Sequence, residues 1–325
     1  MTALRKTRFK DKLDTIFLIN QDIIENCGED SYYCAYSKSS AIISVFDGCG
    51  GLGSRTYQSF KGHTGAYMAS RVVSGAVHDW YHTFFNTEWT SRDQLIDSIN
   101  HYFTKAYDIC SARELENLRI RGSMVRDYPT TAAIALAEDQ DHEISVHVLW
   151  AGDSRVYFLD SRGLAQITED DTDSEDAMDN LFSDGVLTNL LSSDRQYEIH
   201  YKNIKIDRPT VVFAATDGCF GYIPTPMEFE YYLLKTMLDS ENPQIFRHQL
   251  HDYFAEYAGD DFTFGFMSFF YGSYEAMGKS FKERVKEMER EYICRLGDER
   301  NEKDAAELWR KYKPGYERHM NHRKG

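Results

Sequence analysis

The chain has 325 residues and a net charge of −15, with 52 acidic side chains against 37 basic ones. This excess of negative charge argues against a nucleic-acid backbone or an anionic membrane as the main partner. The hydrophobic content of 42% suffices for a sizeable core, and no apolar run approaches the ~18 residues that a membrane span needs.

The sequence opens on charged residues rather than an apolar signal core, and its six cysteines form no CxxC pair. Both features predict a reduced, cytoplasmic protein. A first strand is expected at 15–19, and the aromatic run 31–36 should form a hairpin with the apolar run 41–47. Apolar residues spaced by three and four then predict two helices, over 66–84 and from Ser91 to about Cys110.

The second half begins with closely spaced strands, whose short connections imply antiparallel neighbours. They are expected at 130–137, 144–150, 155–159, 164–168, 198–206 and 210–216. Two helices, 226–239 and 243–257, and a last strand at 262–269 should follow. Two adjacent helices followed by a run of strands do not show the strand–helix alternation of a parallel sheet.

From residue 273 the pattern is helical and highly charged, and we expect Pro314 and Gly315 to interrupt it. The simplest partition is one domain over 1–272 and a helical extension over 273–325. The acidic stretch 169–184 is expected to be a solvated surface. Leu308, Trp309 and Tyr312 look exposed, which suggests a protein partner or self-association through these helices; simple packing on the domain is the alternative.

Carboxylates stand at several predicted strand ends. They occur in Glu29-Asp30, Asp47-Gly48, Gly152-Asp153-Ser154-Arg155, Asp217-Gly218 and Gly259-Asp260-Asp261. A single Asp-Gly is most often an ordinary turn, but five such turns together fit a site for a hard cation. Because no His or Cys pair stands at ligand spacing, Mg²⁺ or Mn²⁺ suits this site better than Zn²⁺.

One motif is misleading. Residues 48–53 satisfy the pattern GxGxxG after a strand. A dinucleotide site would need a helix opening on those glycines, whereas a polar loop follows here. We therefore do not interpret it as a nucleotide-binding turn.

The order of these motifs resembles the metal-dependent protein phosphatase family of type 2C over roughly residues 15–270. The matching segments are Glu29-Asp30, Asp47-Gly48-Cys49-Gly50-Gly51, Thr130-Thr131, Gly152-Asp153-Ser154-Arg155, Ile167-Thr168-Glu169-Asp170, Thr216-Asp217-Gly218 and Asp260-Asp261-Phe262-Thr263. The resemblance implies an α+β fold, a four-layer α-β-β-α sandwich of two central antiparallel sheets flanked by helices. The metals would lie at one end, between the sheets. The resemblance also implies a flap beside the site over about 169–197.

The resemblance also assigns roles to single residues. Asp47 would bridge two metal ions, and the Gly48 carbonyl would hold one of them, directly or through water. Asp217 and Asp260 would complete the shell of one ion. Asp30 would reach the other ion through water, next to Glu29. Asp153 would bind a more weakly held third ion, shared with Asp217. A water activated by the two ions would attack the phosphate directly, without a covalent phosphoenzyme.

One departure from the family pattern concerns the substrate phosphate. Many members grip it with an arginine four residues before the glutamate, and this chain has Glu25 there. Arg55, Lys61 or His63 in the following loop could substitute for it.

The resulting prediction is a Mg²⁺- or Mn²⁺-dependent phosphatase that acts on phosphoserine or phosphothreonine in proteins, binds no nucleic acid and no membrane, and has Asp47, Asp217 and Asp260 at its catalytic centre. Two alternatives remain. The fold could serve as a regulatory binding module with little or no activity, which Glu25 favours, or as a phosphatase of a small phosphorylated molecule.

Overall fold

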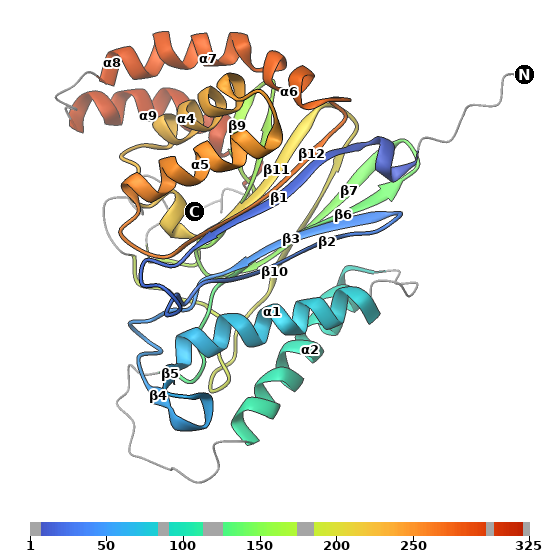
Figure 1. Cartoon of the computed structure of the whole chain (residues 1–325), viewed down its shortest axis with the longest axis vertical. Helices are drawn as coiled ribbons and strands as arrows, with labels where there is room; N and C mark the ends of the chain where they lie inside the picture. Colours follow the sequence, from blue (N-terminus) through green and yellow to red (C-terminus); the bar gives the residue numbers. More distant parts are fainter. Residues whose placement is uncertain (1–7, 84–90, 113–125, 174–184, 297–301, 321–325) are drawn as a thin grey trace, which may run out of the picture.

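The computed structural model describes residues 8–83, 91–112, 126–173, 185–296 and 302–320. Within these ranges, two five-stranded antiparallel sheets are stacked face to face, and helices cover the outer face of each (Figure 1). The predicted α+β class and the four-layer α-β-β-α order are confirmed.

The first sheet has the order β1-β12-β11-β8-β9. Its strands are β1 (Leu13–Gln21), β12 (Phe262–Phe269), β11 (Thr210–Ala215), β8 (Arg155–Asp160) and β9 (Gly163–Gln166). The second sheet has the order β10-β7-β6-β3-β2. Its strands are β10 (His200–Ile206), β7 (Glu143–Ala151), β6 (Ala132–Gln140), β3 (Ser40–Phe46) and β2 (Ser31–Tyr36). A small ribbon pairs β4 (Thr56–Tyr57) with β5 (His63–Thr64).

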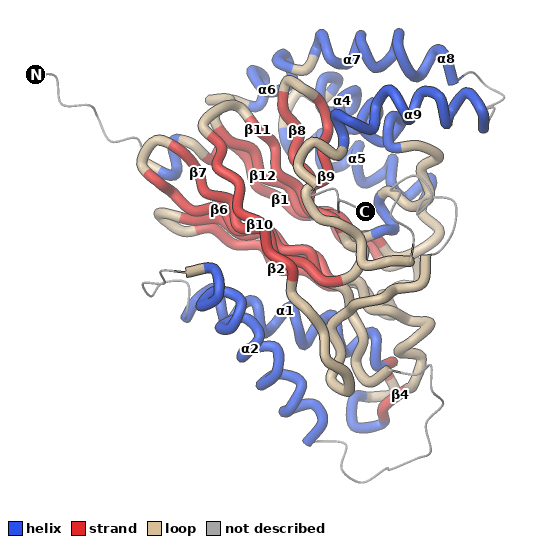
Figure 2. Tube along the Cα trace, turned by 180° about the vertical axis from the view of Figure 1, so that it is seen from behind, coloured by secondary structure: helices blue, strands red, loops and turns tan. Residues whose placement is uncertain are grey.

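The helices lie on the two outer faces, as the view from behind also shows (Figure 2). The second sheet is covered by α1 (Gly65–Thr83) and α2 (Arg92–Ala112). The first sheet is covered by α4 (Pro226–Asp239), α5 (Pro243–Tyr257), α6 (Tyr274–Ser280), α7 (Lys282–Met288), the π turn Glu289–Ile293, α8 (Cys294–Leu296) and α9 (Glu302–Tyr316). Short 3₁₀ turns occupy Phe9–Asp11, Gln58–Phe60 and Asp217–Cys219.

Local sequence explains where the helices begin. The side chain of Thr225 accepts a hydrogen bond from the Glu228 amide, and Pro226 occupies the first turn of α4. Asn242 and Pro243 repeat this arrangement at α5. A capping side chain satisfies an amide that has no partner within the helix, and proline has no amide to satisfy there. Apolar residues of both sheets, among them Ile43, fill the space between the sheets and are fully buried.

Most predicted elements are confirmed, with two corrections. The first strand is longer than 15–19 and runs from Leu13 to Gln21, paired along its length with β12. Pro314 does not interrupt the last helix, since α9 continues through it to Tyr316. A proline so close to the helix end removes only one hydrogen bond of the last turn, and the ring of Pro314 is exposed to solvent. The acidic segment 174–184 of the predicted flap lies outside the described residues.

The predicted exposure of the C-terminal side chains is wrong. Leu308, Trp309 and Tyr312 are 7%, 5% and 4% exposed, and they belong to the same apolar cluster as α4 and the first sheet. An amphipathic helix buries its apolar face wherever a matching surface exists, and the outer face of the first sheet supplies one. The boundary at residue 273 therefore stays a prediction, because these helices share the core of the domain.

No described helix combines the length and apolarity required to cross a membrane. All six cysteines lie in the described ranges, and none of them is disulfide-bonded.

Candidate metal centre

A cavity of about 780 Å³ opens at one end of the two sheets, and six aspartates line it, four of which are predicted ligands. Asp47 follows β3, Asp153 follows β7, Asp217 follows β11, and Asp260 precedes β12. The structure thus brings together four of the predicted ligands, along with Gly48. Antiparallel neighbours place the end of one strand beside the start of the next, so these turns meet at one edge.

Two threonines fix the backbone of Asp47. Its carbonyl oxygen accepts bonds from the Thr131 amide at 2.8 Å and from the Thr130 hydroxyl at 2.7 Å. A Cβ atom on the next residue, Gly48, would lie 2.5 Å from the Ala66 carbonyl oxygen. Only glycine therefore allows helix α1 to approach this turn so closely.

The turn that carries Asp153 is held from both sides. Gly152 has a φ of +95°, and a Cβ atom there would meet the Thr131 side chain at 2.7 Å. The Gly152 amide donates to Asp171 at 2.9 Å, and the Ser154 hydroxyl lies 2.6 Å from that of Thr131. Oδ1 of Asp153 is buried and has no hydrogen-bond partner among the described residues.

Asp30 and Glu29 lie beside this group in different ways. Asp30 is 3% exposed, does not line the cavity, and accepts a bond from the Thr216 hydroxyl at 2.8 Å. Glu29 lines the cavity and accepts a bond from the Thr64 hydroxyl. Asp261, to which we gave no role, accepts bonds from the amides of Ile23 at 2.7 Å and Glu29 at 2.6 Å. It fixes the loop before β2, and sequence offers no local sign of such a long-range contact.

Burial and mutual repulsion make these carboxylates hard to ionise. Burial, followed by the charge of Asp217 and others, raises the pKa of Asp47 well above its usual range. Burial and then Asp260 raise the pKa of Asp217 to about 6. Burial and then Asp217 raise the pKa of Asp153 to about 8. A bound cation would offset both the burial and the repulsion.

The residues present fit divalent cations with oxygen ligands. Several carboxylates converge, and one buried carboxylate oxygen lacks a partner. Such oxygens suit Mg²⁺ and Mn²⁺. In the described part of the chain, three ligand atoms come within 4.8 Å of one another at His248, His251 and Asp252, on the outer surface of α5.

The predicted phosphate-binding residues do not line the cavity. Arg55 forms an ion pair with Asp127 at 3.7 Å, and His63 stacks on a neighbouring tyrosine. Lys61 also lies outside the lining, in a left-handed turn. Three other arginines do line the cavity: Arg155, which is paired with Asp170, and two from loops, Arg126 and Arg195.

These two arginines went unnoticed in the sequence, because neither stands in a recognisable motif. They come together through backbone bonds between their segments. The Ser193 amide donates to the Asp127 carbonyl at 3.0 Å, and the Asp127 amide donates to the Asp194 carboxylate at 3.1 Å. Glu25, at the position of the family's arginine, is exposed on a turn and does not line the cavity.

The sequence model of the family described as protein phosphatase 2C matches residues 20–255, more than half of the chain. The chain therefore belongs to this family, which confirms the resemblance. No curated protein gives a significant match.

Solved structures agree on the fold. The serine/threonine phosphatase Stp1 from Staphylococcus aureus superposes with a TM-score of 0.57 at 15% identity, covering 79% of this chain and 96% of that one. PstP/Ppp from Mycobacterium tuberculosis gives 0.54 at 17% identity, covering 79% and 98%. The PstP catalytic domain in complex with 2 manganese ions gives 0.52 at 15%, covering 79% and 99%.

Proposed function

We propose that this chain is a metal-dependent phosphatase that hydrolyses phosphoserine or phosphothreonine in proteins. The observation that supports this most is the convergence of Asp47, Asp153, Asp217 and Asp260 on one open cavity. Family membership supports the reaction class, and a related domain carries manganese. The proposed ions are Mg²⁺ or Mn²⁺.

Each carboxylate has a proposed place. Asp47 would bridge two ions, with the Gly48 carbonyl beside it, and Asp217 and Asp260 would hold one of the two. Asp153 would serve a third ion through its unpaired oxygen. Asp30 would act from behind the cavity wall, through water. Ions held in this way lower the pKa of water and neutralise charge on a phosphate.

The protein's own contribution is rigidity. Thr130 and Thr131 hold the backbone of Asp47, and Thr216 holds the carboxylate of Asp30. Carboxylates fixed in this way lose little freedom when they bind ions, so less binding energy is spent on ordering them.

We also propose that Arg126 and Arg195 bind the substrate phosphate, in place of Arg55, Lys61 and His63. Both line the same cavity as the aspartates. Charge-assisted bonds from arginine to phosphate are the strongest of their kind, and such a bond is worth about 1.5–3 kcal/mol. Replacing either arginine by alanine should therefore raise the KM for a phosphopeptide by about tenfold or more.

Arg55→Ala provides the control, because Arg55 lies outside the cavity lining but carries the same charge. It should leave KM nearly unchanged. An equal rise in KM for all three variants would point to the overall charge of this surface rather than to a phosphate site.

The decisive experiment measures phosphate release from a phosphothreonine peptide with Mn²⁺, with Mg²⁺, with EDTA, and in the variant Asp47→Asn. Activity that needs the metal and is lost in the variant supports the proposal. Faster turnover of small phosphate esters than of the peptide would favour the small-molecule alternative. Folded protein that is inactive with every divalent metal would reject the enzyme and favour a binding module.

A further inference from the structure

A buried ion pair forms part of the cavity wall. Arg155 begins β8 and donates from Nε to Oδ1 of Asp170 at 3.1 Å and from its terminal nitrogen to Oδ2 at 2.6 Å. The two side chains are 2% and 5% exposed, and both residues line the cavity. A buried ion pair stabilises the fold only if its remaining hydrogen-bond donors and acceptors also have partners.

The remaining bonds of this pair involve the C-terminal helix. The hydroxyl of Tyr316, in α9, donates to Oε1 of Gln166 at 2.8 Å, and Nε2 of Gln166 donates to Asp170 at 2.8 Å. A second guanidinium nitrogen of Arg155 lies 3.5 Å from the same tyrosine oxygen. Arg155, Asp170, Gln166 and Tyr316 thus form a closed ring of polar contacts, which we call the Tyr316 ring.

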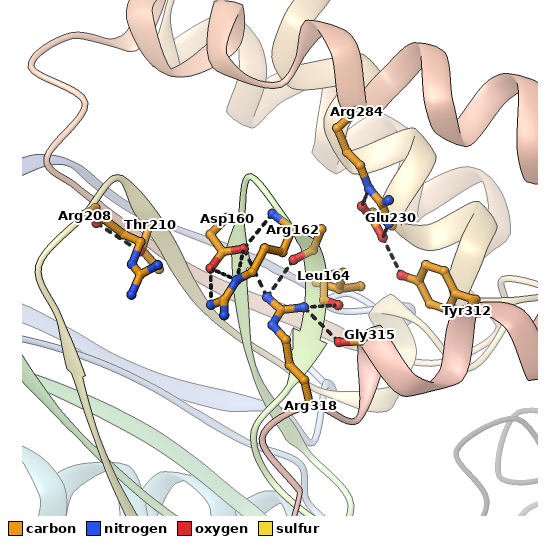
Figure 3. A network of polar contacts seen from close by, with 11 residues as sticks. Asp160, Arg162, Leu164, Arg208, Thr210, Glu230, Arg284, Tyr312, Gly315 and Arg318 are labelled. Carbon is orange, nitrogen blue, oxygen red and sulfur yellow. Dashed lines mark hydrogen bonds and ion pairs between the residues drawn. The ribbon is translucent and has the colours of Figure 1, made fainter.

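Two groups of contacts, one before Tyr316 in the chain and one after it, fix the end of α9. Figure 3 shows these contacts at Tyr312 and at Arg318. On one side, the Tyr312 hydroxyl donates to Glu230, which also receives two bonds from Arg284 at 2.7 and 3.0 Å. On the other side, Arg318 donates to the carbonyl of Leu164 at 3.0 Å and pairs with Asp160 at 3.3 Å. Tyr316 is 1% exposed between them, so its hydroxyl has little freedom.

The Tyr316 ring also reaches the turn that carries Asp153. The residue after Asp170 is Asp171, which accepts a bond from the Gly152 amide at 2.9 Å and donates its own amide to the Gly152 carbonyl at 3.1 Å. Residues 170 and 171 therefore hold the turn at both ends, through Arg155 on one side and Gly152 on the other. Asp153 lies between these two attachments.

We propose that Tyr316 is a positioning residue: its hydroxyl fixes the Arg155–Asp170 pair and thereby holds the Asp153 carboxylate in place for a cation. The family match ends at residue 255, so the C-terminal helix supports the centre from outside the matched region. The inference deepens the proposed function and rests on its metal site at Asp153, but not on its phosphatase activity.

The test compares Tyr316→Phe with Tyr312→Phe. Each variant removes one buried hydroxyl from the same helix and keeps the aromatic side chain. Only the Tyr316 hydroxyl takes part in the Tyr316 ring of polar contacts. The free energy of one such hydrogen bond corresponds to about three- to tenfold in an equilibrium constant. Tyr316→Phe should raise the dissociation constant of the most weakly bound Mn²⁺ by that factor. Tyr312→Phe should leave this constant unchanged.

Mn²⁺ affinity is measured on the full chain without substrate, by calorimetry. The Mn²⁺ concentration for half-maximal phosphatase activity is measured separately, and urea unfolding reports the stability of each variant. Equal Mn²⁺ affinities in wild type and Tyr316→Phe would overturn the proposal. Equal weakening in both variants would also overturn it, since general loosening of the helix would then be the cause.

A second variant covers the case in which Tyr316→Phe does not fold. Gln166→Met breaks the Tyr316 ring without changing α9, so it should weaken the same Mn²⁺ step; unchanged affinity would reject the proposal. Where both single variants fold, their double mutant should be little worse than either, because they interrupt one chain of contacts. Mn²⁺ binding without phosphatase activity would reject the proposed function alone.

Discussion

Asp47 follows β3 of one sheet, Asp217 follows β11 of the other, and both residues line the same cavity. After burial, the charge of Asp217 is the largest cause that raises the pKa of Asp47 and of Asp153. Without cations, holding these carboxyl groups buried and close together therefore costs stability, which is a common compromise at functional sites.

Asp47→Asn should therefore stabilise the metal-free protein while it removes activity. The amide keeps the shape of the side chain but removes the carboxyl group whose ionisation burial and Asp217 make costly. We expect the unfolding temperature in EDTA to rise by about 2–4 °C for each kcal/mol of relieved repulsion. In saturating Mn²⁺ the order should reverse, because wild type gains binding energy that the variant lacks.

Thermal unfolding in EDTA and in Mn²⁺ checks this inversion. Lys205→Gln, which removes a charge from an exposed ion pair on β10, serves as the control. The order of its unfolding temperature and that of wild type should be the same in both conditions. A lower unfolding temperature of Asp47→Asn in both conditions would contradict the expected repulsion.

A second prediction concerns the turn before Asp153. Gly152→Ala forces a Cβ atom to within 2.7 Å of the Thr131 side chain and also strains a φ of +95°. Strain at a positive φ costs about 1–3 kcal/mol, and the clash adds to it. The variant should lose both stability and activity, because Thr131 holds the backbone of Asp47 as well.

Gly62→Ala is the matched control. Its φ of +82° imposes similar strain, but nothing lies within 4 Å of the added carbon. Urea unfolding and phosphatase assays should show Gly62→Ala losing stability alone. Equal activities of the two variants would mean that the turn adapts to the added carbon without moving Asp153.

Sequence reasoning located the aspartates because each stands where an apolar run meets a turn, and such signals are local. It missed the functional contacts whose partners lie far apart in the chain. Tyr316 meets Gln166 at a separation of 150 positions in the chain, and nothing near either residue indicates the other. Arg126 and Arg195 escaped detection for the same reason.

The errors share a physical cause. Leu308 and Trp309 lie in a highly charged helix, so they look exposed when the sequence around them is considered alone. In the structure both are buried against the rest of the domain. Pro314 breaks a helix in isolation, but here tertiary contacts at Tyr316 and Arg318 outweigh the lost hydrogen bond. Local propensity predicted the elements well, whereas tertiary packing decided their ends and their exposure.

A third prediction tests the anchor of the C-terminal helices. Glu230 is fully buried, and Arg284 is its ionic partner. Arg284→Met leaves that carboxylate without its cation, which costs about 3–5 kcal/mol. Lys286→Met, two residues along α7, removes an exposed pair with Glu283 and should cost less than about 1 kcal/mol. Urea unfolding of both variants measures the difference, and similar values would show that Glu230 is satisfied by Tyr312 alone.

The last prediction concerns acid stability. Burial, followed by the charges of Arg318 and Arg162, lowers the pKa of His319 to about 4. The unfolded chain binds a proton near the usual value of ~6.5, so between these two pKa values the unfolded state holds one proton more. Stability from this group is therefore complete above about pH 6.5 and falls as the pH drops toward 4.

His319→Gln removes this contribution and should lose less stability than wild type between pH 7 and pH 5. The surrounding charges stay in place in both proteins; they are Asp160, Arg162, Lys202 and Arg318. Urea unfolding in EDTA at the two pH values gives the difference directly, and His248→Gln, at an exposed histidine, serves as the control. If His319→Gln loses as much stability as wild type, His319 is protonated in the folded protein as readily as in the unfolded one.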